Sequence, residues 1–281
     1  MAHHRIYQYT SIGRPLEPEY PGNKAVLILM PLAALLGAVT AWLAGGQFLQ
    51  VLQSAVSFLL ICFGSWALAR ELFPDDRPAA FVSMVLALLA ALAFDSPGIL
   101  IVFATLGLVR IVNRSTGRPA LKSDSLVVML LTFWVIYATQ SPFYGAVAAL
   151  AFIFDGSLKD PLRRQWIFAL ICFGGMVVYM VDHDAGLGYF QVPDSLLEWL
   201  SMAVLLVLAL NMFLLKEVSS SGVIKHKTLD LSRVKGGMAV GLFAAFQGLV
   251  DAEAVIILMA SLAGIGIGMA FRKAFQAPAS V

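Results

Sequence analysis

Charge is scarce in this sequence. Only 13% of its 281 residues are Asp, Glu, Lys or Arg, whereas 60% are apolar, and the mean hydropathy is +0.85. Soluble globular domains carry about 25% charged residues, so the composition excludes an ordinary soluble domain and indicates a protein whose solvent is the lipid bilayer. The apolar runs also lack the strict alternation of a membrane β-barrel. The sequence therefore predicts an all-α, polytopic integral membrane bundle.

Cysteine is nearly absent as well. The two cysteines, Cys62 and Cys172, lie within apolar runs and have no Cys or His at the spacing of metal ligands. This pattern predicts free, buried thiols rather than a disulfide or a zinc site. No small-residue cleavage site follows the first apolar run, so we expect that run to stay as an uncleaved helix.

Apolar runs bounded by charge, Pro or Gly predict about ten transmembrane helices. Several are shorter than the roughly 20 residues of a full crossing, so we expect the run at 142–155 and the last pair to tilt little, to thin the bilayer or to re-enter it. We expect a cytoplasmic segment at 1–23, one transmembrane domain at 24–271 with a basic cytoplasmic loop at 216–235, and a cytoplasmic tail at 272–281. The helices are expected near 24–44, 48–72, 79–94, 97–113, 124–139, 142–155, 165–181, 195–215, 236–250 and 254–271.

The charges provide a test of this layout that is independent of hydropathy. Threading the chain through ten spans places all 19 Lys and Arg residues on one side. Because basic residues stay in the cytoplasm, both termini are predicted inside, in the inner or plasma membrane. The other side receives only acids and one histidine, namely Asp95, Asp182, His183, Asp184, Asp194, Glu198, Asp251 and Glu253.

The pentapeptide LICFG occurs twice, at 60–64 and at 170–174, in predicted helices that are five apart. An odd offset would place two five-helix halves in opposite orientation, as in the inverted repeats of many secondary transporters. The alternative is chance recurrence in an apolar composition. Both interpretations stay open at this stage.

Polar residues are rare at the predicted mid-depth of the membrane. Such residues usually form hydrogen bonds between helices. We therefore expect that function for the following six rather than ligand binding: Ser57, Ser65, Thr105, Thr132, Asn211 and Gln247.

Ionisable residues at the predicted cytoplasmic helix ends are the candidate site. Arg110, Asn113 and Arg114 have the i, i+3, i+4 spacing of one helical face, and Arg70 ends the second predicted helix. Guanidinium and amide groups bind phosphate or carboxylate, so these four residues predict an anion-binding site at the membrane surface. Alternatively, the arginines extend to anionic lipid headgroups and only fix the orientation of the protein.

Acidic residues follow the second and sixth predicted helices on the same side. They would serve as partners of the arginines, or as weak ligands for a magnesium ion on a diphosphate. Their positions are similar to those of the acidic motifs in UbiA-type membrane prenyltransferases, although RELFPDD and DGSLKD stand where that family has an asparagine-led run of spaced aspartates. These acids are Glu71, Asp75, Asp76, Asp155 and Asp160.

The sequence leaves three functional classes open. The first is a transporter or flippase of a small solute or lipid intermediate, favoured by ten compact spans and the absence of a soluble domain. The second is a membrane-embedded enzyme or binder that acts on a lipid phosphate or diphosphate at the cytoplasmic interface. The third is a structural or assembly protein. The bilayer and anionic headgroups are the expected partners, no nucleic acid is expected, and no cofactor is expected except Mg²⁺ under the second class.

Overall fold

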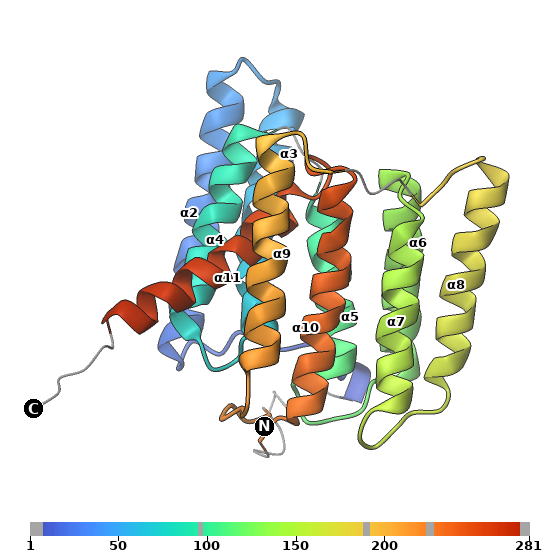
Figure 1. Ribbon diagram of the computed structural model, residues 1–281. Coiled ribbons are helices and arrows are strands. Elements are labelled where there is room, and N and C mark those ends of the chain that lie inside the picture. The colour runs from blue at the N-terminus through green and yellow to red at the C-terminus, as the bar shows by residue number, and fades with distance from the viewer. Residues whose placement is uncertain (1–7, 95–97, 188–191, 223–227, 276–281) are drawn as a thin grey trace, which may run out of the picture.

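The computed structural model describes residues 8–94, 98–187, 192–222 and 228–275, which form a bundle of helices (Figure 1). In these residues there are ten α-helices, one 3-10 turn, η1 Phe246–Leu249, and no strand beyond a single bridge between Ser221 and Thr228. The helices are α2 Pro21–Leu43, α3 Phe48–Leu72, α4 Arg77–Ala93, α5 Ile99–Asn113, α6 Lys122–Thr139, α7 Phe143–Ser157, α8 Gln165–Asp182, α9 Leu196–Leu214, α10 Leu231–Ala245 and α11 Ile256–Phe275.

Each predicted span corresponds to one of these helices, and the largest difference is at α10. This helix begins at Leu231 rather than at residue 236, because the carboxylate of Asp230 caps it by accepting hydrogen bonds from the backbone N–H groups of Ser232 and Arg233. The last part of the predicted loop at 216–235 is therefore helical. The first turn of α10 is polar, so a search for apolar runs did not predict it.

Five helices are long and apolar enough to cross a membrane, namely α2, α3, α6, α8 and α9. Their outward faces expose large apolar side chains such as Leu35, Val178 and Phe213. Soluble proteins rarely expose apolar surface of this extent, so these helices indicate a membrane protein. α5, α7 and α10 have 15 residues each, about 22 Å of helix against a hydrocarbon core of about 30 Å. The number of crossings, ten in the sequence analysis, stays a prediction.

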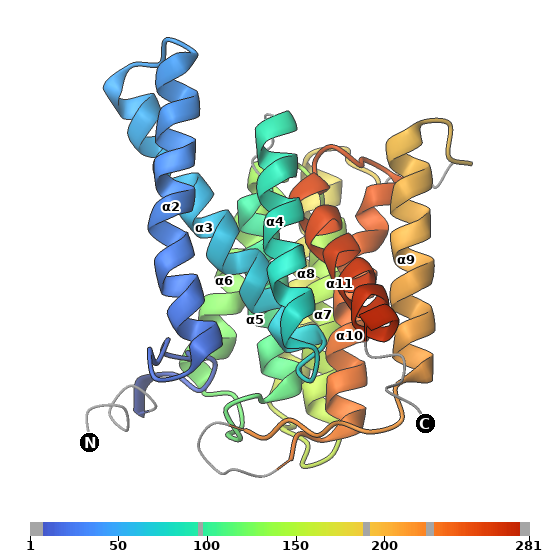
Figure 2. The ribbon, with the colours of Figure 1, turned by 90° about the vertical axis from the view of Figure 1, so that its left-hand side faces the viewer.

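α5 and α10 lie in the middle of the bundle. α5 packs against α3, α6, α7 and α10, while α10 also contacts α7 and α9. At the flanks, α2 packs on α3, and α8 packs on α6 and α7 (Figure 1, Figure 2). The short helices are thus covered by the long apolar ones.

The two LICFG segments lie in different surroundings. In α3, Gly64 packs against Phe103 of α5, whereas in α8 Leu170 and Phe173 are exposed and Gly174 has no neighbour within 4 Å. The inverted repeat therefore stays a prediction that these surroundings do not support. Both cysteines are buried and free, as predicted.

Small residues allow α11 and α4 to approach closely. A Cβ atom added at Gly264 would lie 2.3 Å from Cα of Ser83, and one added at Gly268 would lie 2.4 Å from Cα of Ala79. The two glycines have the GxxxG spacing by which transmembrane helices bring their backbones together. In Figure 1, α11 runs obliquely to the other helices, across α4. The hydroxyl of Ser261 also donates to that of Ser65 at 2.9 Å, which links α11 to α3.

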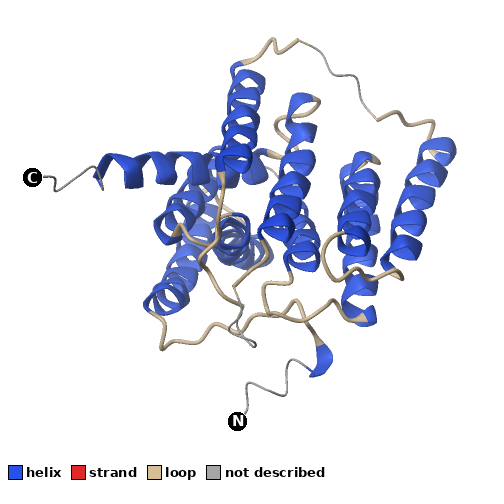
Figure 3. Cartoon of the chain, turned by 60° about the horizontal axis from the view of Figure 1, so that its bottom comes forward, coloured by secondary structure: helices blue, strands red, loops and turns tan. Residues whose placement is uncertain are grey.

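One end of the bundle, here called the basic end, brings together the N-terminal segment and the α3–α4, α5–α6, α7–α8 and α9–α10 connections (Figure 3). Asp124 at the start of α6 accepts hydrogen bonds from Thr10 Oγ1 and from the backbone N–H of Ser11, both at 2.7 Å. The guanidinium of Arg233 donates to the carbonyl oxygen of Lys159 at 3.0 Å. The side of the membrane on which these connections lie stays a prediction. Residues 1–7, 223–227 and 276–281, including parts of the predicted termini and basic loop, lie outside the described residues.

Gly264→Ala should lower the thermal stability of the protein in detergent, because overpacking a tight contact costs about 1 to 3 kcal/mol and the new methyl group would meet backbone atoms of Ser83. Gly174→Ala is the matched control, since open space surrounds that position. Its melting temperature should equal that of the unchanged protein or exceed it slightly. Equal melting temperatures for the two variants would contradict the close α4–α11 contact.

Candidate functional site

Glu71 is the centre of one ion-pair network at the basic end. It lies in the last turn of α3, and only 1% of its side chain is exposed. Its Oε1 atom accepts hydrogen bonds from Arg14 Nη1 at 3.2 Å, from Arg110 Nε at 3.1 Å and from Ser115 Oγ at 3.1 Å. An unpaired buried carboxylate would cost several kcal/mol. Glu71 therefore holds the N-terminal segment and α5 against α3.

Asn113 joins three helices beside this network. Its side-chain Nδ2 donates to the carbonyl oxygen of Glu71 at 2.7 Å, which satisfies one of the carbonyl groups that α3 leaves unpaired at its end. A Cβ atom at Gly237 would lie 2.1 Å from Oδ1 of Asn113, so only glycine lets α10 approach α5 here. The amide is thus part of the packing of α3, α5 and α10.

Asp155 is the centre of a second network. It is fully buried in α7, and its Oδ1 accepts hydrogen bonds from Arg114 Nε and Arg233 Nη1, both at 2.8 Å. Its Oδ2 accepts from Gln165 Nε2 at 2.9 Å, and Gln165 Oε1 in turn accepts from Ser125 Oγ at 3.1 Å. One buried carboxylate therefore connects α6, α7, α8, α10 and the end of α5.

The structure divides the predicted arginine cluster between the two networks. Arg110 and Asn113 lie at Glu71, but Arg114 turns to Asp155, because α5 ends at Asn113 and Arg114 adopts a left-handed backbone conformation with φ of 50°. The shared helical face expected for these three residues requires a helix that continues through Arg114. Asp160 contributes its backbone carbonyl, which accepts from Arg114 Nη1 at 3.0 Å.

Asp75 and Asp76, in the α3–α4 connection, both accept hydrogen bonds from backbone N–H groups. Asp75 accepts hydrogen bonds from the backbone N–H groups of Ser219 at 2.8 Å and Ser220 at 2.7 Å, and Asp76 caps α4 by accepting from Ala79 N at 3.3 Å. Burial by itself would raise the pKa of Asp75, but the hydrogen bonds from Ser220 and Ser219 outweigh it and lower the pKa below its ordinary value. Asp75 is therefore ionised at neutral pH and fastens the α9–α10 connection to the α3–α4 connection.

A magnesium ion on a diphosphate usually needs only one or two carboxylates besides water and phosphate oxygens. In the part of the chain that the structure describes, no three Asp, Glu, His or Cys side chains come together. Glu71 and Asp155 accept hydrogen bonds from arginines, Asp75 from serines and Asp76 from the backbone. The function of these acids as weak magnesium ligands stays a prediction.

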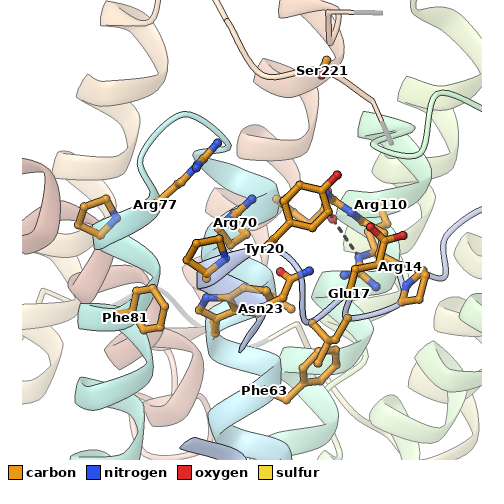
Figure 4. A pocket seen from close by; sticks show the side chains of 18 of the residues that line it. Arg14, Glu17, Tyr20, Asn23, Phe63, Arg70, Arg77, Phe81, Arg110 and Ser221 are labelled. Carbon is orange, nitrogen blue, oxygen red and sulfur yellow. Dashed lines mark hydrogen bonds and ion pairs between the residues drawn. The ribbon is translucent and has the colours of Figure 1, made fainter. Parts of the chain in front are cut away.

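A cavity of about 600 Å³ opens beside the Glu71 network (Figure 4). Its walls come from the N-terminal segment, the start of α2, the last turns of α3, the start of α4, one residue of α5 and two residues of the α9–α10 connection, Ser221 and Gly222. The aromatic side chains of Phe63, Trp66 and Phe81 form much of its apolar wall. Four arginines also line the cavity, namely Arg14, Arg70, Arg77 and Arg110.

Arg70 lines this cavity and has no hydrogen-bond partner among the described residues. Its Cζ atom lies 5.6 Å from the ring centroid of Trp66, and its side chain makes no hydrogen bond or ion pair with any described residue. Arg70 Nε and Trp66 Nε1 are both buried without a partner. Buried donors without acceptors cost about 1 to 3 kcal/mol each. Both donors therefore favour a ligand that brings acceptor oxygens into the cavity.

Arg70 and Arg110 are recognisable as candidate site residues from the sequence, whereas Arg14, Arg77 and Arg233 are not. Arg233 had one usable signal, the Asp230 cap three residues before it, which marks a helix start. Nothing in the local sequence separates Arg14 from an ordinary loop cation, since Glu71 is 57 positions away.

The chain matches no protein-family model, no curated protein and no solved structure. Its function is therefore argued from the geometry of the basic end.

Asp155→Asn should destabilise the protein strongly, because it leaves the two guanidinium groups of Arg114 and Arg233 without their counter-charge. Removing one partner of a buried pair costs about 3 to 5 kcal/mol, whereas an exposed pair contributes about 0 to 1 kcal/mol. The control is Asp182→Asn, since Asp182 is exposed and pairs only with the exposed His183. Denaturant titration in mixed micelles should show a large loss for the first variant alone, and similar losses would rule out the buried network.

Proposed function

We propose that this membrane protein binds an anionic amphiphile, such as a lipid phosphate, with the anionic group at the basic end. The observation that carries the proposal is the pair of unpartnered buried donors, Arg70 Nε and Trp66 Nε1, in the wall of the cavity. The arginines supply positive charge, and the aromatic residues supply a surface for an apolar chain. This is the second functional class of the sequence analysis, with binding as its core and catalysis unassigned.

Transport, the first class of the sequence analysis, has less support from particular residues. At mid-depth, the hydroxyl of Thr132 donates to the Val128 carbonyl of its own helix, and the amide of Asn211 donates to the Val207 carbonyl of its own helix. The donors of these two side chains are therefore already used within their own helices. Movement of a bound amphiphile between leaflets would still begin from the proposed site.

We also propose that the basic end faces the cytoplasm of the inner or plasma membrane. The support is the positive-inside rule, because the connections at this end carry the basic residues and the opposite connections carry acids.

In intact cells, a cysteine at position 118 should resist a membrane-impermeant maleimide, whereas a cysteine at position 184 should react with it. Both variants are best made in a background without Cys62 and Cys172, which are buried. Both positions should react once the membrane is permeabilised. External labelling at position 118 would reverse or abolish the proposed orientation.

Arg70→Gln should weaken binding of dodecyl phosphate to the purified protein by about tenfold or more, since a hydrogen bond to a charged group contributes about 1.5 to 3 kcal/mol. Because Arg70 holds no other described residue, the melting temperature should stay near that of the unchanged protein. Isothermal titration calorimetry in detergent micelles would measure the affinity. The matched control is Arg163→Gln, an exposed arginine that does not line the cavity.

Three outcomes would count against the proposal. No binding of dodecyl phosphate to the unchanged protein would remove it. Equal losses in Arg70→Gln and Arg163→Gln would show that Arg70 only packs against Trp66. Inorganic phosphate that displaces dodecyl phosphate at equal concentration would show that the site takes the free anion rather than an amphiphile.

A further inference from the structure

The charged residues of the cavity bear on the charge of its ligand. The described lining has four arginines and two glutamates, Glu17 and Glu71, so the formal net charge of these residues is +2. The positive charge of the described lining comes from arginines alone, and an arginine keeps its charge across the physiological pH range.

The positive charge is unevenly neutralised. Glu71 Oε1 accepts from both Arg14 and Arg110, so a single carboxylate serves two guanidinium groups. Arg70 and Arg77 form no ion pair with a described residue. Figure 4 shows Arg70 between Arg77 on one side and Arg110 on the other. The excess positive charge therefore spreads along one wall of the cavity.

We propose that the ligand carries a doubly charged phosphate, as a phosphomonoester or diphosphate on an apolar chain, and not a phosphodiester. This inference rests on the proposed function. A charge of −2 neutralises the cavity, whereas the single charge of a phosphodiester leaves one guanidinium uncompensated in partly desolvated surroundings. The terminal oxygens of a monoester also provide acceptors for Arg70 Nε and Trp66 Nε1 together with Arg77.

A monoester makes this inference testable through pH. Its second ionisation has a pKa of about 6, so the doubly charged form dominates at pH 7.5 and is lost toward pH 5. A phosphodiester keeps one charge over the same interval. The ionisable groups facing a bound phosphate are Arg14, Glu17 and Tyr20 before and at the start of α2, Arg70 and Glu71 of α3, Arg77 of α4 and Arg110 of α5.

The experiment compares dodecyl phosphate with its methyl ester, dodecyl methyl phosphate, by calorimetry on the purified full chain. At pH 7.5 the monoester should bind at least tenfold more tightly than the diester. At pH 5 the monoester should weaken toward the diester, whose affinity should change less than twofold. Arg77→Gln removes one exposed cation and should reduce the monoester preference to about threefold or less, while Arg163→Gln should keep it at tenfold.

The two levels of the proposal fail differently. If both esters bound the unchanged protein equally at pH 7.5, the proposal of a doubly charged ligand would be wrong, but the proposal that the protein binds an anionic amphiphile would be supported. If neither ester bound, the proposed function would be wrong as well. A monoester preference that persisted unchanged at pH 5 or in Arg77→Gln would also overturn the assignment, because the preference would then not arise from the second negative charge.

Discussion

Two buried carboxylates, Glu71 and Asp155, determine how the basic end is built. A carboxylate removed from water must be compensated by nearby cations and hydrogen-bond donors, because its desolvation costs several kcal/mol. Each acid meets this requirement with two arginines from distant parts of the sequence. Since removing either partner would leave a charge buried and unpaired, the helix ends that carry these groups cannot separate freely. The arrangement of α3, α5, α7 and α10 at this end follows from that constraint.

Two of the connecting segments are attached to the helices by hydrogen bonds from neutral donors. Asp124 accepts hydrogen bonds from Thr10 and Ser11 of the N-terminal segment, and Asp75 accepts them from Ser219 and Ser220 of the α9–α10 connection. Hydroxyl and backbone N–H donors bind the carboxylates of the buried Asp124 and the half-buried Asp75. As a result the N-terminal segment lies across the ends of α3 and α6 and becomes a wall of the cavity.

Much of the fold could be predicted from the sequence, because hydropathy and the location of basic residues depend on the bilayer rather than on tertiary contacts. The site could be predicted only in part. Arg110 and Asn113 were recognisable from helical spacing, but the partner of Arg114 depends on one left-handed residue at the end of α5. From the sequence, Arg233 was expected in a loop. In the structure Asp230 caps α10 at its N-terminus, so the helix begins at Leu231 and includes Arg233. The partners of Arg114 and Arg233 thus depend on backbone conformation and on a residue more than 40 positions away in the sequence, Asp155.

The same electrostatic constraint explains why the cavity differs from its surroundings. At Glu71 Oε1 and at Asp155 the buried negative charge is compensated by arginines of the protein itself, so those arginines serve the fold, while Glu71 Oε2 is buried without a partner. Arg70 has the same side chain and a buried Nε, yet it lies over the face of Trp66 and forms no hydrogen bond or close ion pair with a carboxylate of the described residues. Cation–π contact contributes about 0.5 to 2 kcal/mol, which is no more than the cost of one buried donor without an acceptor, about 1 to 3 kcal/mol. Arg164 Nε is also buried without a partner, but Arg164 donates to the carbonyl oxygen of Ala120. Arg70 has no hydrogen-bond partner among the described residues and lines the cavity, so an anion from outside the chain would supply its acceptor.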